Sequence, residues 1–226
     1  LDLKEKKLDD LAEQIGDEDG EAIGIECDVS QAEEVRAAVR QVLDRWGRID
    51  IVFANAGING VWAPIDELKP EEWDETMAVN LKGTFLVVKY TVPALKQNGG
   101  SIIITSSVNG TRIFSNAGAT AYSCSKAGQV AFCKMAAFEL APHSIRVNVI
   151  CPGAIETQIG QNTQKRDTED LGPKVEFPEG REPLGDRGRG QPEDVAELVL
   201  FLASKASRHI TGTVTYIDAG HSLLQG

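Results

Sequence analysis

Five stretches of the chain carry apolar residues at spacings of three and four, the pattern of amphipathic helices. Two of them open on a proline followed by acidic residues, at Pro70 and Pro192, and such residues suit the first turn of a helix. The stretches predicted to be helical are 4–15, 31–46, 70–96, 121–141 and 192–204.

Short apolar runs of a second kind lie between these stretches. They read AIGIEC (22–27), DIVFA (50–54), SIIITS (101–106), RVNVI (146–150) and TVTYID (213–218). Because they do not alternate with polar residues, they are typical of strands that are covered on both faces. Strands that alternate with helices predict a parallel sheet with right-handed crossovers. The sequence therefore predicts an α/β fold, a doubly wound parallel sheet in a single domain over residues 1–226.

One region breaks this alternation. Residues 154–190 are rich in glycine, proline, arginine and acidic residues and follow neither period. A long irregular segment inside a compact domain is usually a functional lid or a disordered loop. A helix and a strand of the earlier pattern follow it, so we predict a lid over a binding site and not a linker between domains.

Composition and charge narrow the possible functions. The 226 residues carry a net charge of −11 without a basic stripe, which weighs against binding to nucleic acid. No apolar run approaches the roughly 18 residues of a membrane span, and no leader segment is visible. Four cysteines lie far apart without a CxxC motif, so we expect no metal site, reduced thiols and a cytoplasmic protein. The three histidines are scattered, and a structural or surface role is expected for each: His143, His209 and His221.

Ligands of open parallel sheets bind beyond the carboxyl ends of the strands, so the residues that follow each predicted strand are candidates for a site. Four of the five strand ends carry glycine, which lets a backbone approach a ligand closely. The residues at these ends are Asp28-Val29, Asn55-Ala56-Gly57, Ser107-Val108-Asn109-Gly110, Cys151-Pro152-Gly153, and Asp218 with Gly220. Together they predict a binding crevice along one edge of the sheet.

A tyrosine and a lysine stand four residues apart at the start of the helix predicted over 121–141. Residues at this spacing share one helix face, so Tyr122 and Lys126 lie one turn apart. On spacing alone, the pair fits a solvated surface contact as well as a catalytic site. The neighbouring motifs decide between the two.

Six motifs, in one consistent order along residues 1–226, resemble those of the short-chain dehydrogenase/reductase family. The matching stretches are DV (28–29), ANAG (54–57), VNLKG (79–83), SSVNG (106–110), AYSCSK (121–126) and VNVICPGAIET (147–157). The resemblance implies a Rossmann-like fold that transfers a hydride between a nicotinamide cofactor and a secondary alcohol or ketone.

The resemblance also implies a role for each matching residue. Tyr122 would donate a proton to a carbonyl oxygen in reduction and accept one in oxidation, with its pKa lowered by Lys126 and by the positive nicotinamide ring. Ser107 would hold the substrate oxygen, and Lys126 would also bind the nicotinamide ribose. Asn80 would hold a water that links Lys126 to solvent. The implied cofactor-binding residues are Asp2, Asp28, Val29, Asn55, Ala56, Gly57, Tyr122, Lys126, Pro152, Gly153, Ile155 and Thr157.

Two features depart from the family pattern. The glycine-rich turn TGxxxGIG is absent, and the opening LDLKEKKLDDLAEQI resembles the end of the second strand and the helix after it. We therefore expect the given sequence to lack about 35 residues, which would hold the first strand, the phosphate turn and the first helix. In addition, fifteen residues separate Ser107 from Tyr122, about two more than is common in the family, which predicts altered specificity in the TRIFSNAGAT loop.

The preferred form of the cofactor depends on Asp2. The resemblance puts this residue at the end of the second strand, where a carboxylate binds the adenosine ribose hydroxyls and repels a 2′-phosphate. We therefore expect NAD, with NADP as the alternative because Lys4, Lys6 and Lys7 are nearby.

The substrate is less defined by the sequence. Candidate pocket residues are Ser107, Asn109, Arg112, Phe114, Val61, Trp62 and the lid after Ile155. The first hypothesis is a dehydrogenase of a sugar, polyol or other small alcohol. The alternative is a 3-oxoacyl-carrier-protein reductase, although a charge of −11 and a single lysine, Lys96, before the serine strand disfavour an acidic carrier protein.

Two further expectations concern class and assembly. A regulator that binds NAD(P) without turnover is the alternative of another class, and the intact Ser107, Tyr122 and Lys126 argue against it. The resemblance implies pairing of the helices at 70–96 and 121–141 across subunits, and both are apolar over more than one face. A homodimer or homotetramer that acts on a small molecule is therefore expected.

Overall fold

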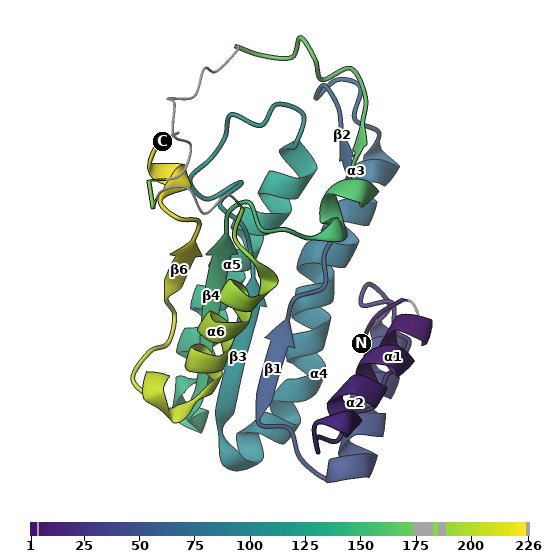
Figure 1. The fold of residues 1–226 in the computed structure, drawn as a ribbon, viewed down its shortest axis with the longest axis vertical. Coiled ribbons are helices and arrows are strands. Elements are labelled where there is room, and N and C mark those ends of the chain that lie inside the picture. Colours follow the sequence, from purple (N-terminus) through teal and green to yellow (C-terminus); the bar gives the residue numbers. More distant parts are fainter. Residues whose placement is uncertain (4, 174–182, 185–188, 225–226) are drawn as a thin grey trace.

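The computed structural model describes residues 1–3, 5–173, 183–184 and 189–224 (Figure 1). Its centre is a parallel sheet of four strands in the order β1-β3-β4-β6. The strands are β1 (Ile51–Ala54), β3 (Gly100–Thr105), β4 (Ile145–Pro152) and β6 (Val214–Ile217). Four of the five predicted strands are thus confirmed. The side chains of β3 and β4 form the densest part of the core, where Ile102, Ile104, Val147 and Val149 are fully buried.

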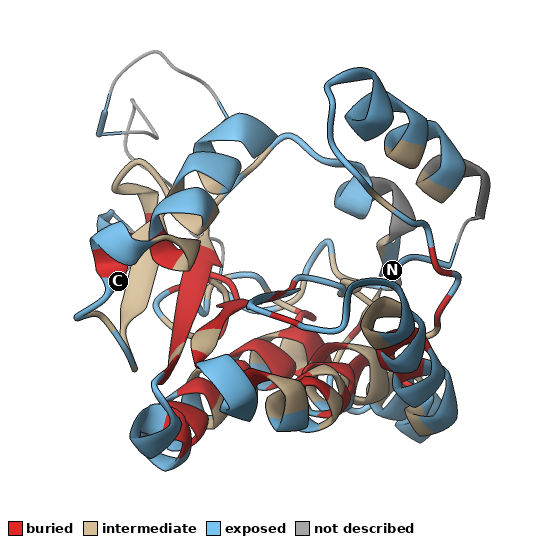
Figure 2. Cartoon of the chain, turned by 90° about the horizontal axis from the view of Figure 1, so that it is seen from below, coloured by how far each residue is buried: buried red, intermediate tan, exposed pale blue. Residues whose placement is uncertain are grey.

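Helices cover both faces of this sheet (Figure 2). One side carries α2 (Ala32–Trp46), α4 (Gly83–Asn98) and α5 (Thr120–Leu140), and the other carries α6 (Pro192–Ala203). The helix α1 (Glu5–Asp17) lies apart from the four strands (Figure 1). The α/β, doubly wound, Rossmann-like architecture is therefore confirmed. Three predicted helices, those at 31–46, 121–141 and 192–204, agree with the structure to within one residue at each end.

The helix predicted over 70–96 is divided into three parts. It consists of α3 (Pro70–Met77), a π-helical turn (Ala78–Lys82) and α4. The backbone oxygen of Asn80, inside the π turn, accepts hydrogen bonds from Thr84 Oγ1 at 2.8 Å and from Gln129 Nε2 at 2.9 Å. These two donors stabilise the widened turn, and turns of this kind are frequent at functional sites.

The prediction that residues 22–27 form a strand of the main sheet is wrong. A strand needs a ladder of partners, and this segment has one parallel bridge, between Asp2 and Glu26. The backbone N–H of Cys27 donates to the Asp2 carbonyl at 3.0 Å, so the chain start lies against the segment that leads to Asp28.

The predicted lid contains some regular structure. A 3-10 turn spans Gln158–Asn162, and β5 (Gln164–Lys165) pairs in parallel with β2 (Val61–Trp62). Residues 174–182 and 185–188 of the lid lie outside the described residues. Further 3-10 turns occur at Ala141–His143, Lys205–Ser207 and His221–Leu223. Among the helices described, none has the length and apolarity needed to cross a membrane.

Candidate active site

A cavity of about 450 Å³ lies beyond the carboxyl ends of the strands, the edge at which the sequence predicts a crevice. Residues from loops far apart in the chain form its wall. The lining residues are Asn59, Trp62, Ser107, Val108, Asn109, Ile113, Asn116, Tyr122, Gly153, Ala154, Ile155, Thr157, Ile159, Gly160, Arg189 and His221. Within this lining, no carboxylate side chain occurs among the described residues.

Ser107 and Tyr122 meet on the cavity wall. Ser107 follows β3 and Tyr122 lies in the first turn of α5, and their side chains are hydrogen-bonded to each other. Both are buried, with 7% and 8% of their surface exposed. The Ser107 hydroxyl also accepts the backbone N–H of Asn109 at 3.1 Å, which fixes its orientation. A hydroxyl and a phenol oriented together on a cavity wall can hold one substrate oxygen between them.

Lys126 lies one turn along α5, beneath this pair. Its ammonium group donates to the carbonyl of Thr105 at 2.9 Å and lies 5.6 Å from the centroid of the Tyr122 ring. Ser106 Oγ donates to the Lys126 carbonyl at 2.7 Å, which joins the end of β3 to α5. The three residues that the sequence predicts to be catalytic, Ser107, Tyr122 and Lys126, therefore lie close together.

Burial controls the protonation of both ionisable groups. It raises the pKa of Tyr122 above its ordinary value, opposed by the hydrogen bond from Ser107. Burial also lowers the pKa of Lys126 to about 8. Removal from water thus has the largest effect on the pKa of Tyr122 in the protein chain by itself, and the lowering expected from Lys126 together with the nicotinamide ring stays a prediction.

Asn80 stabilises the floor of the site from the π turn. It is fully buried, its Oδ1 accepts the N–H of Ile58 at 2.8 Å, and its Nδ2 donates to the Ile58 carbonyl at 2.9 Å and to Ser125 Oγ at 3.0 Å. One amide thus joins the loop after β1 to α5. No described contact shows a bridge from Asn80 to bulk solvent, so the water relay stays a prediction.

Replacing Asn80 by alanine is expected to lower the free energy of unfolding by about 2–4 kcal/mol, because both polar groups of Ile58 lose their partner. Urea unfolding followed by circular dichroism measures the change. The control is Asn98→Ala at the exposed end of α4, where a change below about 0.5 kcal/mol is expected. Equal effects of the two substitutions would contradict a special role for the Asn80 amide.

The backbone after β1 passes directly over the catalytic residues. A Cβ atom on Gly57 would lie 3.1 Å from Asn80 Oδ1 and 3.4 Å from Lys126 Nζ. Asn55 precedes it, and its Oδ1 accepts a hydrogen bond from Thr105 Oγ1 at 2.9 Å. Ala56 completes the ANAG loop between the two. A glycine at this point lets the loop pack closely against the side chains of Asn80 and Lys126.

Carboxylates occupy the other end of this edge. The Asp28 side chain accepts the N–H of Ser30 at 2.9 Å. Burial alone would raise the pKa of Asp28, but hydrogen bonds from Ser30 and Gln31 hold it below its ordinary value. Val29 is buried against Gly83, and Asp2 lies beside this segment through its backbone pairing. Asp2 therefore lies close to the segment that carries Asp28 and Val29.

The Pro-Gly turn after β4 completes the edge. Pro152 accepts the N–H of Val108 at 3.0 Å, and a Cβ on Gly153 would lie 2.7 Å from the Asp218 side chain. Ile155 and Thr157 line the cavity, and the Thr157 hydroxyl accepts the N–H of Ile159 at 3.4 Å. These four predicted cofactor residues therefore lie together.

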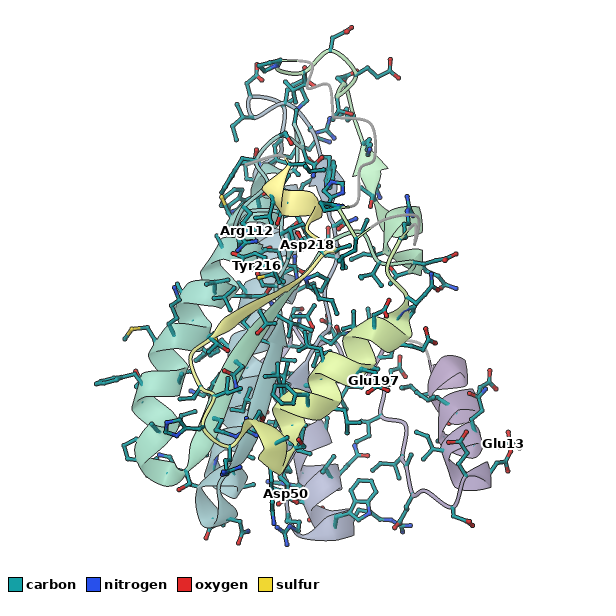
Figure 3. All side chains as sticks on the ribbon, turned by 60° about the vertical axis from the view of Figure 1, so that its left-hand side comes forward. Glu13, Asp50, Arg112, Glu197, Tyr216 and Asp218 are labelled. Carbon is teal, nitrogen blue, oxygen red and sulfur yellow. The ribbon has the colours of Figure 1, made fainter. Side chains whose placement is uncertain are left out.

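Three predicted substrate residues, Val61, Arg112 and Phe114, are not in the cavity lining. Phe114 is 74% exposed. The Arg112 guanidinium lies 3.5 Å from the centroid of the Tyr216 ring and donates to Ser222 Oγ at 3.4 Å (Figure 3). An aromatic face and a nearby carboxylate at Asp218 stabilise this cation more than an open cavity would. Asn109, in contrast, does line the cavity and accepts a 2.6 Å hydrogen bond from Asn116 Nδ2.

Sequence reasoning missed His221, which lines the cavity from the turn after β6. Asp218 stabilises this turn by accepting the N–H groups of Gly220 at 3.2 Å and Ser222 at 2.8 Å. Burial opposes ionisation of Asp218, but these bonds and the charge of Arg112 hold its pKa below the ordinary value. His221 therefore lies at the cavity, and the structural or surface role expected for it stays a prediction.

Asn59, Asn116 and Arg189 also line the cavity; none was named as a site residue, although Asn116 lies in the TRIFSNAGAT loop and Arg189 in the predicted lid. Of these, Asn59 follows the ANAG motif by two residues, a signal that could have been used. No group of three or more potential metal ligands occurs in the described part of the chain.

Comparisons with known proteins agree with this geometry. Residues 1–222 match the family model described as "Enoyl-(Acyl carrier protein) reductase". The 3-oxoacyl-[acyl-carrier-protein] reductase FabG of Thermotoga maritima is 40% identical over 220 residues, which are 97% of this chain and 85% of that protein. The chain belongs to the short-chain dehydrogenase/reductase family of NAD(P)-dependent oxidoreductases.

Solved structures show the same likeness. A 3-ketoacyl-ACP reductase from Sinorhizobium meliloti has a TM-score of 0.93 and 51% identity, with coverage of 98% of this chain and 88% of that one. Carveol dehydrogenase from Mycobacterium avium, solved in complex with NAD, has a TM-score of 0.84 and 30% identity, with coverage of 96% and 81%.

Proposed function

We propose that this protein oxidises a small secondary alcohol, such as a sugar or polyol, or reduces the corresponding ketone, with Ser107, Tyr122, Lys126 and Asn80 as its catalytic group. The observation that carries the proposal is the Ser107–Tyr122 hydrogen bond on the cavity wall, directly above Lys126. A nicotinamide cofactor bound along the edge would supply or accept the hydride.

The protein's own residues perform the proton chemistry. Ser107 holds the substrate oxygen in reach of the Tyr122 phenol, which donates its proton during reduction and accepts one during oxidation. Because burial raises the pKa of Tyr122, the phenol is protonated at neutral pH and ready to act as a donor. Lys126 contributes positive charge beneath the ring, which stabilises the phenolate when it forms.

The test of this function is a panel of secondary alcohols and ketones followed by the absorbance of the reduced nicotinamide. Polyols, sugars and aliphatic alcohols are each supplied with NAD and with NADP. Turnover of one class supports the proposal. Cofactor binding without turnover across the panel would favour a non-catalytic regulator that senses NAD(P).

A 3-oxoacyl-carrier-protein reductase is the second candidate, since two relatives bear such names. The cavity wall combines polar side chains, Asn59, Asn109 and Asn116, with apolar ones, Trp62, Val108, Ile113, Ile155 and Ile159, so it also has room for an apolar chain. Adding acetoacetyl-CoA to the panel separates the candidates, because only the second predicts that this thioester is the preferred substrate.

We propose NAD as the preferred cofactor, on the position of Asp2 beside the Asp28 segment. Asp2→Ala should shift the NAD to NADP ratio of kcat/KM toward NADP by about 10- to 100-fold, because charge-assisted hydrogen bonds to the ribose are lost. Asp10→Ala in α1 removes the same charge nearby and serves as the control. An unchanged ratio in Asp2→Ala would overturn the assignment.

We further propose a homodimer or homotetramer assembled through α4 and α5. Large apolar side chains on these helices are exposed, with Phe138 at 84%, Met135 at 62% and Phe85 at 42%. A second copy of the chain would bury them.

A further inference from the structure

A second, smaller cavity adjoins the proposed active site. It measures about 240 Å³ and is lined by residues of the β2–β5 pair and of the loop before α5. Its lining residues are Trp62, Ser115, Asn116, Ala117, Lys165, Thr168, Glu169, Leu171, Gly172 and Pro173. Trp62 and Asn116 line both cavities, so a substrate held at Tyr122 can extend into the smaller one past these two residues.

Two buried polar atoms at this cavity have no hydrogen-bond partner. Among the described residues, three buried side-chain atoms are unpartnered: Trp62 Nε1, Ser115 Oγ and Gln129 Oε1. The first two belong to the lining of this one cavity. Buried polar groups are almost always hydrogen-bonded, because an unmade bond costs about 1–3 kcal/mol. Two such atoms at one cavity therefore indicate a site for a polar ligand group.

The chemistry of the lining defines that group. The indole N–H of Trp62 can only donate, so its partner must be an acceptor, whereas the Ser115 hydroxyl can donate and accept. The Lys165 ammonium lies 5.1 Å from the centroid of the Trp62 ring, and Glu169 brings the opposite charge to the same cavity. Because the two charges balance, a neutral group that both donates and accepts fits better than a carboxylate.

We propose that Trp62 and Ser115 form a subsite that binds a hydroxyl group of the substrate, remote from the carbon that is oxidised. This inference rests on the proposed function and specifies its substrate as a diol or polyol. The hydroxyl oxygen accepts from Trp62 Nε1, and its hydrogen bond with Ser115 completes the pair. The remote hydroxyl takes no part in the reaction and determines only which alcohols bind.

The test compares substrates that differ only in the remote group. Hexan-2-ol, hexane-1,5-diol and 5-hydroxyhexanoate are supplied with NAD, together with the shorter homologues pentane-1,4-diol and butane-1,3-diol. The wild type is expected to favour the best diol over hexan-2-ol by at least about 10-fold in kcat/KM. Ser115→Ala should reduce that preference by about 3- to 10-fold while the rate with hexan-2-ol stays unchanged, and Trp62→Phe should reduce the preference by a similar factor. Trp46→Phe, at the end of α2, is the control and should preserve the preference.

Calorimetric binding of the same alcohols in the presence of NAD is the second readout. Diol binding that is lost in Trp62→Phe and Ser115→Ala, but without any turnover, would support the subsite and sink the proposed function. Turnover with equal kcat/KM for hexan-2-ol and every diol would sink the subsite and leave the proposed function intact. A preference for 5-hydroxyhexanoate would overturn the hydroxyl assignment in favour of a carboxylate bound by Lys165.

Discussion

Replacing Tyr122 by phenylalanine is expected to lower kcat for alcohol oxidation by about 10²- to 10⁴-fold, the usual contribution of a positioned acid–base group. The substitution removes one hydroxyl and keeps the ring that packs in the first turn of α5. Because the phenol's hydrogen bond is to Ser107 and not to the sheet, the fold and the affinity for cofactor should change little.

The measurements are steady-state kinetics and cofactor titration on the same preparation. Tyr90→Phe in α4 is the matched control, because it removes the same hydroxyl group from a tyrosine that is half-buried and lies outside the site. It should leave kcat within about twofold. If Tyr122→Phe kept a near-normal rate, the assignment of the proton donor would have to be abandoned.

Lys126→Met is expected to reduce kcat by about 10²-fold or more, because the positive charge beneath the phenolate is lost. It should also change how stability depends on pH. Burial lowers the pKa of Lys126 to about 8 from its ordinary value of 10.5, so the ammonium destabilises the folded chain by an amount on the order of 3 kcal/mol below pH 8.

The sign follows from proton binding. Between pH 8 and 10.5 the unfolded chain holds more protons on Lys126 than the folded chain, so this residue makes stability rise with pH in that window. Lys126→Met removes the rise. The free energy of unfolding of the variant minus that of the wild type should therefore fall as pH increases from 7.5 to about 9.5.

Urea unfolding without added cofactor at several pH values measures this difference. Lys134→Met, on the exposed side of α5, controls for the loss of a lysine and should give a difference that does not vary with pH. A pH-independent difference for Lys126→Met as well would mean that the buried amine keeps an ordinary pKa.

The apolar pattern predicted most of the fold because burial dictates it directly. The stretches 121–141 and 192–204 bury one face against the sheet, and 31–46 buries one face against α4. Their apolar period therefore predicted their ends to within one residue. The same pattern could not reveal the π turn at Ala78–Lys82, because an inserted turn changes the hydrogen bonds of the backbone and not its average polarity. The run at 22–27 has the composition of a strand, but a strand also needs a neighbouring strand with which to form a ladder of hydrogen bonds. The local sequence does not show whether such a neighbour exists.

The catalytic group was predictable for a different reason. Ser107 follows a strand, and Tyr122 and Lys126 lie one turn apart at the start of the next helix. The resemblance to the short-chain dehydrogenase/reductase motifs was needed to connect the three. The cavity wall was not predictable, because Asn116, Arg189 and His221 reach it through loops whose paths depend on tertiary contacts. Arg112 shows how far prediction from the sequence reaches. Its position in the sequence suggested the substrate pocket, but the Tyr216 ring and the Asp218 carboxylate bind its guanidinium outside the cavity lining.

The most direct test of the central claim follows the hydride itself. The full-length protein is incubated with NAD and a secondary alcohol deuterated at the carbinol carbon, and the reduced nicotinamide is examined by mass spectrometry. The account predicts one deuterium in the cofactor with the wild type and at most a trace with Tyr122→Phe. Cofactor that binds but carries no deuterium for any alcohol that the protein binds would contradict it.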